Sequence, residues 1–134
     1  MIDHLKIGEL DIQIVIPMTG NGSRFKAAGY DVLKPFIEVQ GRPMIEWIVR
    51  MFPGDQDKIT FICRKEHLDK FDYIRKVLTR TAPLATIVEI NEWKRKGPVF
   101  DVLLAQDFID EDRPVLVSYC DFYMQWDYHL FKKQ

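Results

Sequence analysis

IQIVIPMTGNGSRF, at residues 12–25, is the stretch of sequence that decides the fold. Its first part, residues 12–16, is rich in β-branched residues and is bounded by Pro17, which predicts a buried strand. The glycine- and serine-rich segment that follows, from Met18 to Tyr30, predicts a long loop. Ligands of α/β proteins bind where the chain leaves the carboxyl end of a strand. We therefore place the candidate binding site at this loop.

The rest of the chain alternates between strand patterns and helix patterns. Short apolar runs predict further strands at residues 36–39, 58–63, 85–90 and 115–119. Apolar residues at helical spacing predict helices at residues 43–52, 65–80 and 98–109. Most of these strands look buried on both faces, which is typical of parallel strands covered by helices. We predict a single α/β domain over residues 1–134, with a Rossmann-like, largely parallel sheet flanked by helices.

Composition and charge exclude several classes of partner. The 134 residues carry a net charge of −1, which leaves no electrostatic footprint for nucleic acid or for an anionic membrane. No apolar run approaches the ~18 residues that span a bilayer, and residues 1–10 are too polar for a signal peptide. Cys63 and Cys120 lie in or beside apolar runs, which indicates free thiols. We therefore predict a cytoplasmic protein without nucleic-acid or membrane partners.

The loop after the first strand carries a phosphate-binding pattern. Gly20 and Gly22 allow backbone N–H groups to approach a phosphate closely. Arg24 adds a fixed fork of donors that matches phosphate oxygens. A surface loop with an incidental arginine is the alternative interpretation. The dinucleotide fingerprint would need a third glycine, where Phe25 stands, and the Gly-Lys-Ser/Thr end of a P-loop is absent.

Two further residues have charges suited to a nucleotide site. Pro35 biases Lys34 toward an extended backbone, and a lysine there is a compact positive charge for a phosphate. Asp121 follows the last predicted strand, where one carboxylate together with substrate phosphates can hold Mg²⁺. The alternatives are a solvated lysine and an aspartate that closes a turn.

Three remaining features have weaker functional interpretations. Gly97 and Pro98 open a predicted helix, whose free N–H groups suit an anion or a polar ring, although an ordinary helix start is the favoured interpretation. Asp127 is expected to cap a helix that starts at Tyr128. The three tryptophans are too dispersed for a stacking platform, and core packing explains Trp47.

Taken together, residues 14–25 and 33–47 resemble the signature of the sugar-phosphate nucleotidyltransferases. The shared order is a strand, Gly-x-Gly-Ser/Thr-Arg, Lys-Pro, an apolar strand, Gly-x-Pro-Met and a helix. Residues 97–105 and 115–121 are similar to later blocks of that family, so the resemblance covers nearly the whole chain. It implies the nucleotide-diphospho-sugar transferase fold, with this chain as the N-terminal nucleotide-binding half. The domain is then incomplete at its C-terminus relative to the family.

The resemblance also implies roles for individual residues. It assigns Arg24 to the β- and γ-phosphates of a nucleoside triphosphate, and Lys34 to a place between the α-phosphate and an acceptor phosphate. It assigns Asp121 to Mg²⁺. The residues that the resemblance places around the nucleotide are Pro17, Met18, Thr19, Gly20, Asn21, Gly22, Ser23 and Gly97.

The function implied is transfer of a nucleoside monophosphate from a triphosphate to a sugar phosphate or similar phosphorylated acceptor, with release of pyrophosphate. Synthesis of a surface-polysaccharide precursor is the expected context. Two alternatives stay open: a non-catalytic nucleotide-binding or regulatory module, and a glycosyltransferase that uses a nucleotide sugar. The Asp-x-Asp pattern of the latter is absent, because Phe122 and Tyr123 follow Asp121. An open sheet edge further predicts a homo-oligomer.

Overall fold

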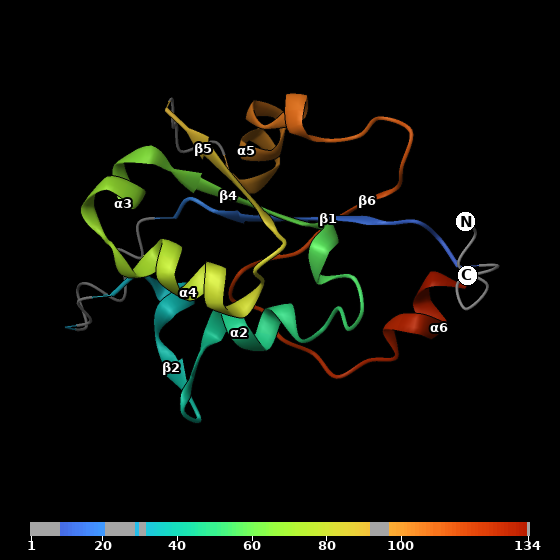
Figure 1. Cartoon of the computed structure of the whole chain (residues 1–134), viewed down its shortest axis with the longest axis horizontal. Helices are drawn as coiled ribbons and strands as arrows, with labels where there is room; N and C mark the ends of the chain where they lie inside the picture. Colours follow the sequence, from blue (N-terminus) through green and yellow to red (C-terminus); the bar gives the residue numbers. More distant parts are fainter. Residues whose placement is uncertain (1–8, 21–28, 30–31, 92–96, 134) are drawn as a thin grey trace.

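Four parallel strands form the centre of the molecule. The computed structural model describes residues 9–20, 29, 32–91 and 97–133. In the sheet, β1 (Gln13–Met18) lies between β4 (Ile59–Arg64) and β6 (Val115–Val117), and β5 (Thr86–Ile90) is outside β4. All the pairings are parallel, as Figure 1 shows. The predicted α/β class with a largely parallel sheet is therefore confirmed.

Strand β1 is the most deeply buried element of this sheet. Its six residues are all buried, and the register places Ile14 opposite Ile59 and Met18 opposite Cys63. The strand does not stop at Pro17, as the sequence pattern predicts, but continues through it to Met18. Proline lacks only the N–H donor, so near a strand end it removes a single ladder bond.

Helices cover both faces of the sheet. On one face, α2 (Met44–Val49), α3 (Lys65–Lys70) and α4 (Tyr73–Thr81) share a core with β1 and β4. On the other face, α5 (Pro98–Leu104) packs on a smaller core that includes Val15, Ile62 and Ala105. The antiparallel hairpin of β2 (Glu38–Val39) and β3 (Arg42–Pro43) precedes α2, and α6 (Tyr128–Lys132) closes the fold. The described residues also include the short 3-10 helices η2 (Lys34–Phe36), η3 (Gln56–Lys58) and η4 (Gln106–Phe108).

Several predicted elements are shorter than their apolar patterns; the helix predicted at 43–52, for example, spans only Met44–Val49. The helix predicted at residues 65–80 is split, because Phe71 has an extended backbone and its ring packs against the core. The helix predicted at 98–109 ends at Leu104, beyond which a 3-10 turn follows. The strand predicted at 36–39 contains only β2, because the residues around Pro35 form a 3-10 helix.

The outer strands differ from the prediction that most strands are buried on both faces. In β5 only Val88 and Ile90 are buried. In β6 the side chains of Val115 and Val117 are 42% and 44% exposed. Strand β6 pairs only with β1 in the described part of the chain, which makes it an edge strand there. The predicted oligomer that would cover this edge stays a prediction.

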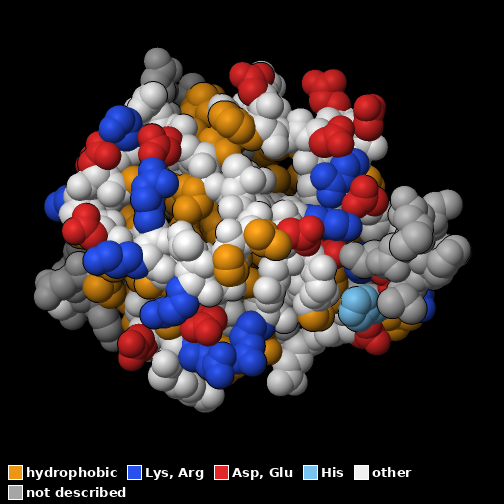
Figure 2. Space-filling view, viewed as in Figure 1, with side chains coloured by type: hydrophobic (Ala, Val, Ile, Leu, Met, Phe, Trp, Pro, Cys, Tyr) orange, Lys and Arg blue, Asp and Glu red, His pale blue; other side chains and the backbone are white. Residues whose placement is uncertain are grey.

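Side chains of both charges are interspersed over the face seen in Figure 2. No field of one sign dominates this face, in line with the small net charge. None of the helices in the described ranges has the length and apolar character that crossing a bilayer requires.

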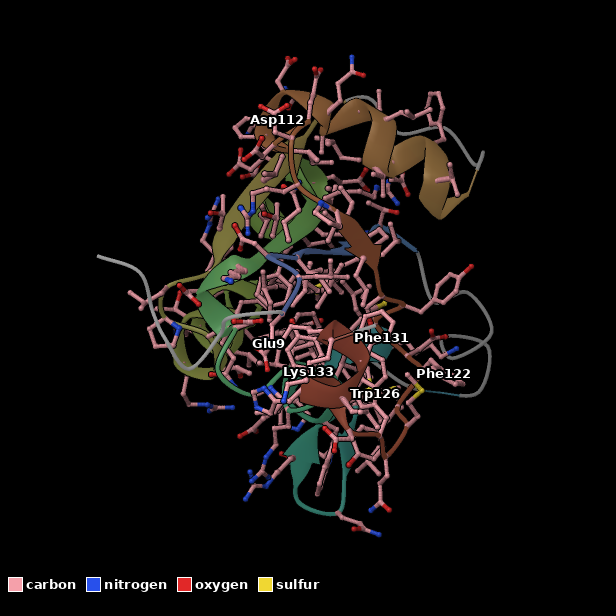
Figure 3. All side chains as sticks on the ribbon, turned by 90° about the vertical axis from the view of Figure 1, so that its right-hand side faces the viewer. Glu9, Asp112, Phe122, Trp126, Phe131 and Lys133 are labelled. Carbon is pink, nitrogen blue, oxygen red and sulfur yellow. The ribbon has the colours of Figure 1, made fainter. Side chains whose placement is uncertain are left out.

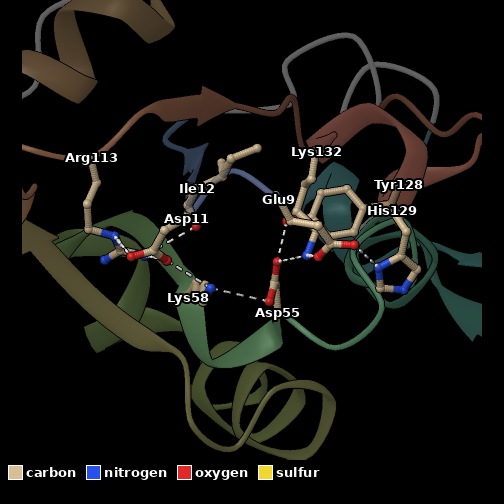
Figure 4. A network of polar contacts seen from close by, with 9 residues as sticks. All are labelled: Glu9, Asp11, Ile12, Asp55, Lys58, Arg113, Tyr128, His129 and Lys132. Atoms are coloured by element: carbon tan, nitrogen blue, oxygen red, sulfur yellow. Dashed lines mark hydrogen bonds and ion pairs between the residues drawn. The ribbon is translucent and has the colours of Figure 1, made fainter. Parts of the chain in front are cut away.

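A buried ionic cluster attaches α6 to the amino ends of the strands. Lys132 Nζ lies 2.8 Å from Asp55 Oδ2 and 3.1 Å from Glu9 Oε2, and the lysine side chain is only 1% exposed. The Tyr128 hydroxyl donates to the same Asp55 oxygen over 2.7 Å, as Figure 4 shows. Burial alone would lower the pKa of Lys132, but the hydrogen bonds to Asp55 and Glu9 outweigh it and raise that pKa. The backbone of Leu10 adds a bond to the Lys132 carbonyl.

We expect Lys132→Met to destabilise the protein by about 3 kcal/mol, because the fully buried Asp55 carboxylate would lose the nearer of its two cations and keep only Lys58, 3.5 Å away. Lys133→Met changes the exposed neighbour and serves as the matched control. Urea unfolding followed by tryptophan fluorescence measures both free energies of unfolding. Equal free energies of unfolding for the two variants would contradict a stabilising role of this ionic cluster.

Candidate nucleotide-binding site

The carboxyl ends of β1 and β6 lie side by side and define the candidate site. The Ser118 N–H, just beyond β6, donates to the Val15 carbonyl in β1 over 2.9 Å. Beyond this point the chain leaves the sheet at both strands: Thr19–Gly20 follow β1, and residues 119–121 follow β6. The site is therefore at the edge where ligands of α/β sheets bind.

Lys34 and Asp121, 87 positions apart in the sequence, meet at this edge. The Lys34 ammonium nitrogen lies 2.6 Å from Asp121 Oδ2. Lys34 does not adopt the predicted extended backbone but begins η2, and Leu33 is the extended residue instead. Proline is accepted in the first turn of a helix, which explains the shift by one residue.

The ion pair of Lys34 and Asp121 is partly open to solvent. The two side chains are 37% and 34% exposed. Pairs this exposed contribute on the order of 0–1 kcal/mol to stability. The pair therefore places a positive and a negative group at the sheet edge without locking them together.

Thr19 and Asp101 connect the exit of β1 to the start of α5. The Thr19 hydroxyl donates to Asp101 Oδ2, and both side chains are buried. Asp101 Oδ1 has no hydrogen-bond partner among the residues that the structure describes. Burial raises the pKa of the Asp101 carboxyl, while the hydrogen bond from Thr19 and the charge of Arg64 act in the opposite direction.

Asp101 is the residue of this region that the sequence prediction misses. The sequence feature that could have identified Asp101 is its position four residues before Ala105. Ala105 is fully buried. That spacing places both on the inner face of α5. The apolar residues Val99 and Leu103 are instead 70% and 57% exposed. The apolar pattern of this helix is therefore right at Val102 and Ala105, which pack on the core, and wrong at Val99 and Leu103.

We expect Asp101→Asn to raise stability at pH 7 by about 1 kcal/mol, because it removes a buried charge and keeps an oxygen for Thr19. An acid whose pKa is raised by folding stabilises the folded protein while the acid is protonated. This contribution to the free energy of unfolding is lost as the pH rises through the folded-state pKa. The gain should therefore shrink toward acid pH. Urea unfolding at several pH values, with the exposed Asp107→Asn as control, measures it. A pH-independent difference would refute this assignment.

The other predicted nucleotide-binding residues fall into three groups. Pro17 and Met18 end β1 and are buried, whereas Gly20 is exposed beyond it. Gly97 is exposed at the start of α5, and its φ of 95° is a left-handed conformation that favours glycine. Asn21, Gly22, Ser23 and Arg24 lie outside the described residues.

Asp121 fits a magnesium ion only as one ligand among several. Within the described ranges, no group of three or more His, Cys, Asp or Glu side chains is arranged to hold a metal. Mg²⁺ commonly takes one or two carboxylates and completes its shell with water and substrate phosphates. A single half-exposed carboxylate at the sheet edge is compatible with that pattern.

The two cysteines are free, as predicted. Burial raises the pKa of both thiols to about 12, and the neighbouring Asp121 adds to this effect at Cys120. Both side chains are therefore neutral thiols at physiological pH. The raised pKa of Cys120 argues against a thiolate nucleophile next to Asp121.

Trp47 is not a core residue, contrary to the sequence interpretation. Its side chain is half-buried, and its indole N–H donates to the Val39 carbonyl over 2.8 Å. The ring faces a cavity beside Asp121. An apolar position on α2 has the same spacing whether it faces the core or a cavity, so the sequence pattern does not separate the two.

This fold is that of sugar-phosphate nucleotidyltransferases over about half of their length. The sequence matches no family model and no curated protein. Among solved structures, a nucleoside-diphosphate-sugar pyrophosphorylase from Vibrio cholerae is similar, with 28% identity and a TM-score of 0.64. The match covers 81% of this chain and 47% of that one.

Two further solved structures share the fold at lower identity. The inositol-1-phosphate CTP transferase from T. maritima has 17% identity and a TM-score of 0.63, over 81% of this chain and 43% of that one. A Bacillus anthracis protein, described as a glucose-1-phosphate thymidylyltransferase, has 22% identity and a TM-score of 0.68. That match covers 90% of this chain and 48% of the other.

Proposed function

We propose that this chain is the nucleotide-binding domain of a nucleotidyltransferase. In the proposed reaction, a nucleoside monophosphate passes from a triphosphate to a sugar phosphate or similar phosphorylated acceptor. The observation that carries the proposal is the meeting of Lys34 and Asp121 at the carboxyl ends of β1 and β6. A cytoplasmic role in making surface-polysaccharide precursors is part of the same proposal.

The reaction requires positioning and charge neutralisation more than covalent help from the protein. An oxygen of the acceptor phosphate attacks the α-phosphorus, the bond between the α-phosphorus and its bridging oxygen breaks, and pyrophosphate leaves. The Lys34 ammonium is the group we assign to the crowded oxygens around the α-phosphorus. Arg24 is assigned to the β- and γ-phosphates, which become the leaving group.

Asp121 is the carboxylate that we assign to Mg²⁺. When bound, the metal would offset negative charge on the triphosphate. In the structure Asp121 holds the Lys34 ammonium at the same edge, so a triphosphate would find both groups within one site. Because this ion pair is weak, phosphate oxygens can replace the carboxylate as partners of Lys34 at little cost in stability.

The nucleotide itself is proposed to lie between the exit of β1 and the start of α5. The bond from Thr19 to Asp101 holds these two segments together. Gly20 and Gly97 are exposed on either side and carry no side chain that would keep a ligand from the backbone. Pro17 and Met18 support the loop from within the sheet, and residues 21–23 complete the proposed binding set.

We expect Lys34→Ala to reduce pyrophosphate release about 10²–10³-fold, because a charge aimed at the reacting phosphates is lost. Its stability should change by less than about 1 kcal/mol. Arg24→Ala should lose most turnover for the same reason. Lys76→Ala alters an exposed lysine of α4 and is the matched control. Near-wild-type pyrophosphate release by Lys34→Ala would refute the assigned role.

A non-catalytic nucleotide-binding module is the second candidate function. It is retained because the structural similarity covers only about half of the solved structures with the same fold, so their activity is not carried over with the fold. Both candidates bind a triphosphate, but only the first releases pyrophosphate when an acceptor is present. The two functions are therefore separable by experiment.

We expect one of CTP, UTP, dTTP, GTP and ATP, with Mg²⁺, to raise the thermal midpoint of the wild-type protein. A ligand at about 100 times its Kd adds about 2.7 kcal/mol to the free energy of unfolding. With Mg²⁺ present, the nucleotide should raise the thermal midpoint of the Asp121→Asn variant less than that of the wild type. Without Mg²⁺, the nucleotide should raise both midpoints equally. Absence of a shift with all five nucleotides would exclude both candidate functions.

A further inference from the structure

A buried polar pair interrupts the apolar packing between α5 and the sheet. Figure 3 shows α5 above the sheet and α6, which carries Phe131, below it. The core on the α5 side consists of Val15, Ile62, Val88, Ile90 and Ala105. Beside this core, Asp101 of α5 is 2% exposed and accepts a hydrogen bond from the Thr19 hydroxyl. The pair therefore belongs to the layer that joins α5 to the strands.

Stability does not explain why this pair is polar. Asp101 Oδ1 lacks a hydrogen-bond partner in the described ranges, and a buried carboxylate oxygen without a donor is destabilising. The Arg64 guanidinium has its own carboxylate partner in Glu66, over 2.7 Å. Two apolar side chains of similar shape would fill the space of the pair without a buried charge. Residues that lower stability beside a ligand site often serve the ligand site.

Asp101 connects the two segments between which the nucleotide is proposed to lie. Its carboxylate holds Thr19, and its backbone N–H donates to the Gly97 carbonyl over 3.3 Å. One residue thus links the exit of β1 to the start of α5 by two hydrogen bonds. Gly20 and Gly97 have only open space where a side chain would stand, so neither has side-chain contacts to hold the other segment.

A hydrogen bond fixes such a junction more narrowly than apolar contact does. It restricts both the distance and the direction between donor and acceptor, whereas apolar attraction has no direction. The separation of Gly20 and Gly97 therefore depends on the pair of Thr19 and Asp101. A misplacement of about 1 Å in a site can cost about 10²-fold in function. The polar pair is thus suited to hold the two walls of the nucleotide site.

We propose that Asp101 is a positioning residue of the nucleotide site, which acts through Thr19 to set the separation of Gly20 and Gly97. This role rests on the proposed function and requires no contact between Asp101 and the nucleotide. Stability and nucleotide affinity then oppose each other at this pair. Apolar side chains would suit the fold, whereas the polar pair suits the site.

The test replaces both partners at once. Thr19→Val combined with Asp101→Leu keeps side chains of similar size and removes the hydrogen bond together with the buried charge. The double variant also avoids the unpaired hydroxyl or carboxylate that either single change would leave in the core. Isothermal titration with CTP, UTP, dTTP, GTP and ATP, each with Mg²⁺, gives the affinities. Thermal unfolding without ligand gives the stability of each protein.

Two control variants separate positioning from packing. Asp101→Asn keeps an acceptor for the Thr19 hydroxyl and should restore the function of the pair. Val102→Ala changes the next residue of α5, which packs on the same core, and leaves the polar pair intact. Its thermal midpoint should fall because a buried contact is lost.

We expect the double variant to bind nucleotide about tenfold or more weakly than the wild type. Its thermal midpoint without ligand should equal or exceed that of the wild type. Asp101→Asn and Val102→Ala should both stay within about threefold of the wild-type affinity. Affinity and stability would then change independently, which a merely structural contact would not produce.

Three results would overturn this role and leave the proposed function standing. The first is equal nucleotide affinity in the wild type and the double variant. The second is a loss of affinity in Val102→Ala as large as in the double variant, because binding would then follow the packing of α5 in general. The third is an equally large loss in Asp101→Asn, which keeps the acceptor. A wild-type chain that binds none of the five nucleotides would instead remove the proposed function, and the positioning role with it.

Discussion

The parallel pairing of β1 on both of its sides is the constraint on which the rest of the structure depends. Because β1 is central and fully buried, its carboxyl end is the point at which the chain must leave the sheet. Because β6 pairs with β1 in parallel, the residues that follow β6 leave the sheet at the same edge. Lys34 and Asp121 meet there although neither is near the other in sequence. Side-chain chemistry at this edge is thus a consequence of strand order.

Much of this arrangement follows from the sequence by simple rules. The β-branched run at residues 12–16 and the later apolar runs predict the strands of the parallel sheet. Carboxyl ends of parallel strands share an edge, so Asp121 is expected at the edge where the chain leaves β1. Asp127 likewise caps α6 as expected, since its carboxylate accepts from the Leu130 N–H. These features depend on local pattern and on the direction of the strands, which short-range rules capture.

Features that depend on tertiary packing were not predictable in the same way. Phe71 interrupts a helical pattern because its ring packs on the core, and no local signal marks that choice. Trp47 has a core-like spacing but faces a cavity that residues 121–125 complete. Val115 and Val117 are apolar like core residues, yet the edge position of β6 leaves them exposed. The partners that decide these outcomes come from distant parts of the chain.

The ionic contacts at the opposite rim of the sheet have a consequence for how the protein tolerates change. Asp11, Lys58 and Arg113 join the amino ends of β1, β4 and β6, beside the cluster of Asp55 and Lys132. The ligand site that we propose lies at the carboxyl rim, at the other ends of the same strands. Substitutions at two distant, unconnected places usually have additive effects. Rigidity and recognition can therefore be altered independently in this molecule, each by changes at its own end of the strands.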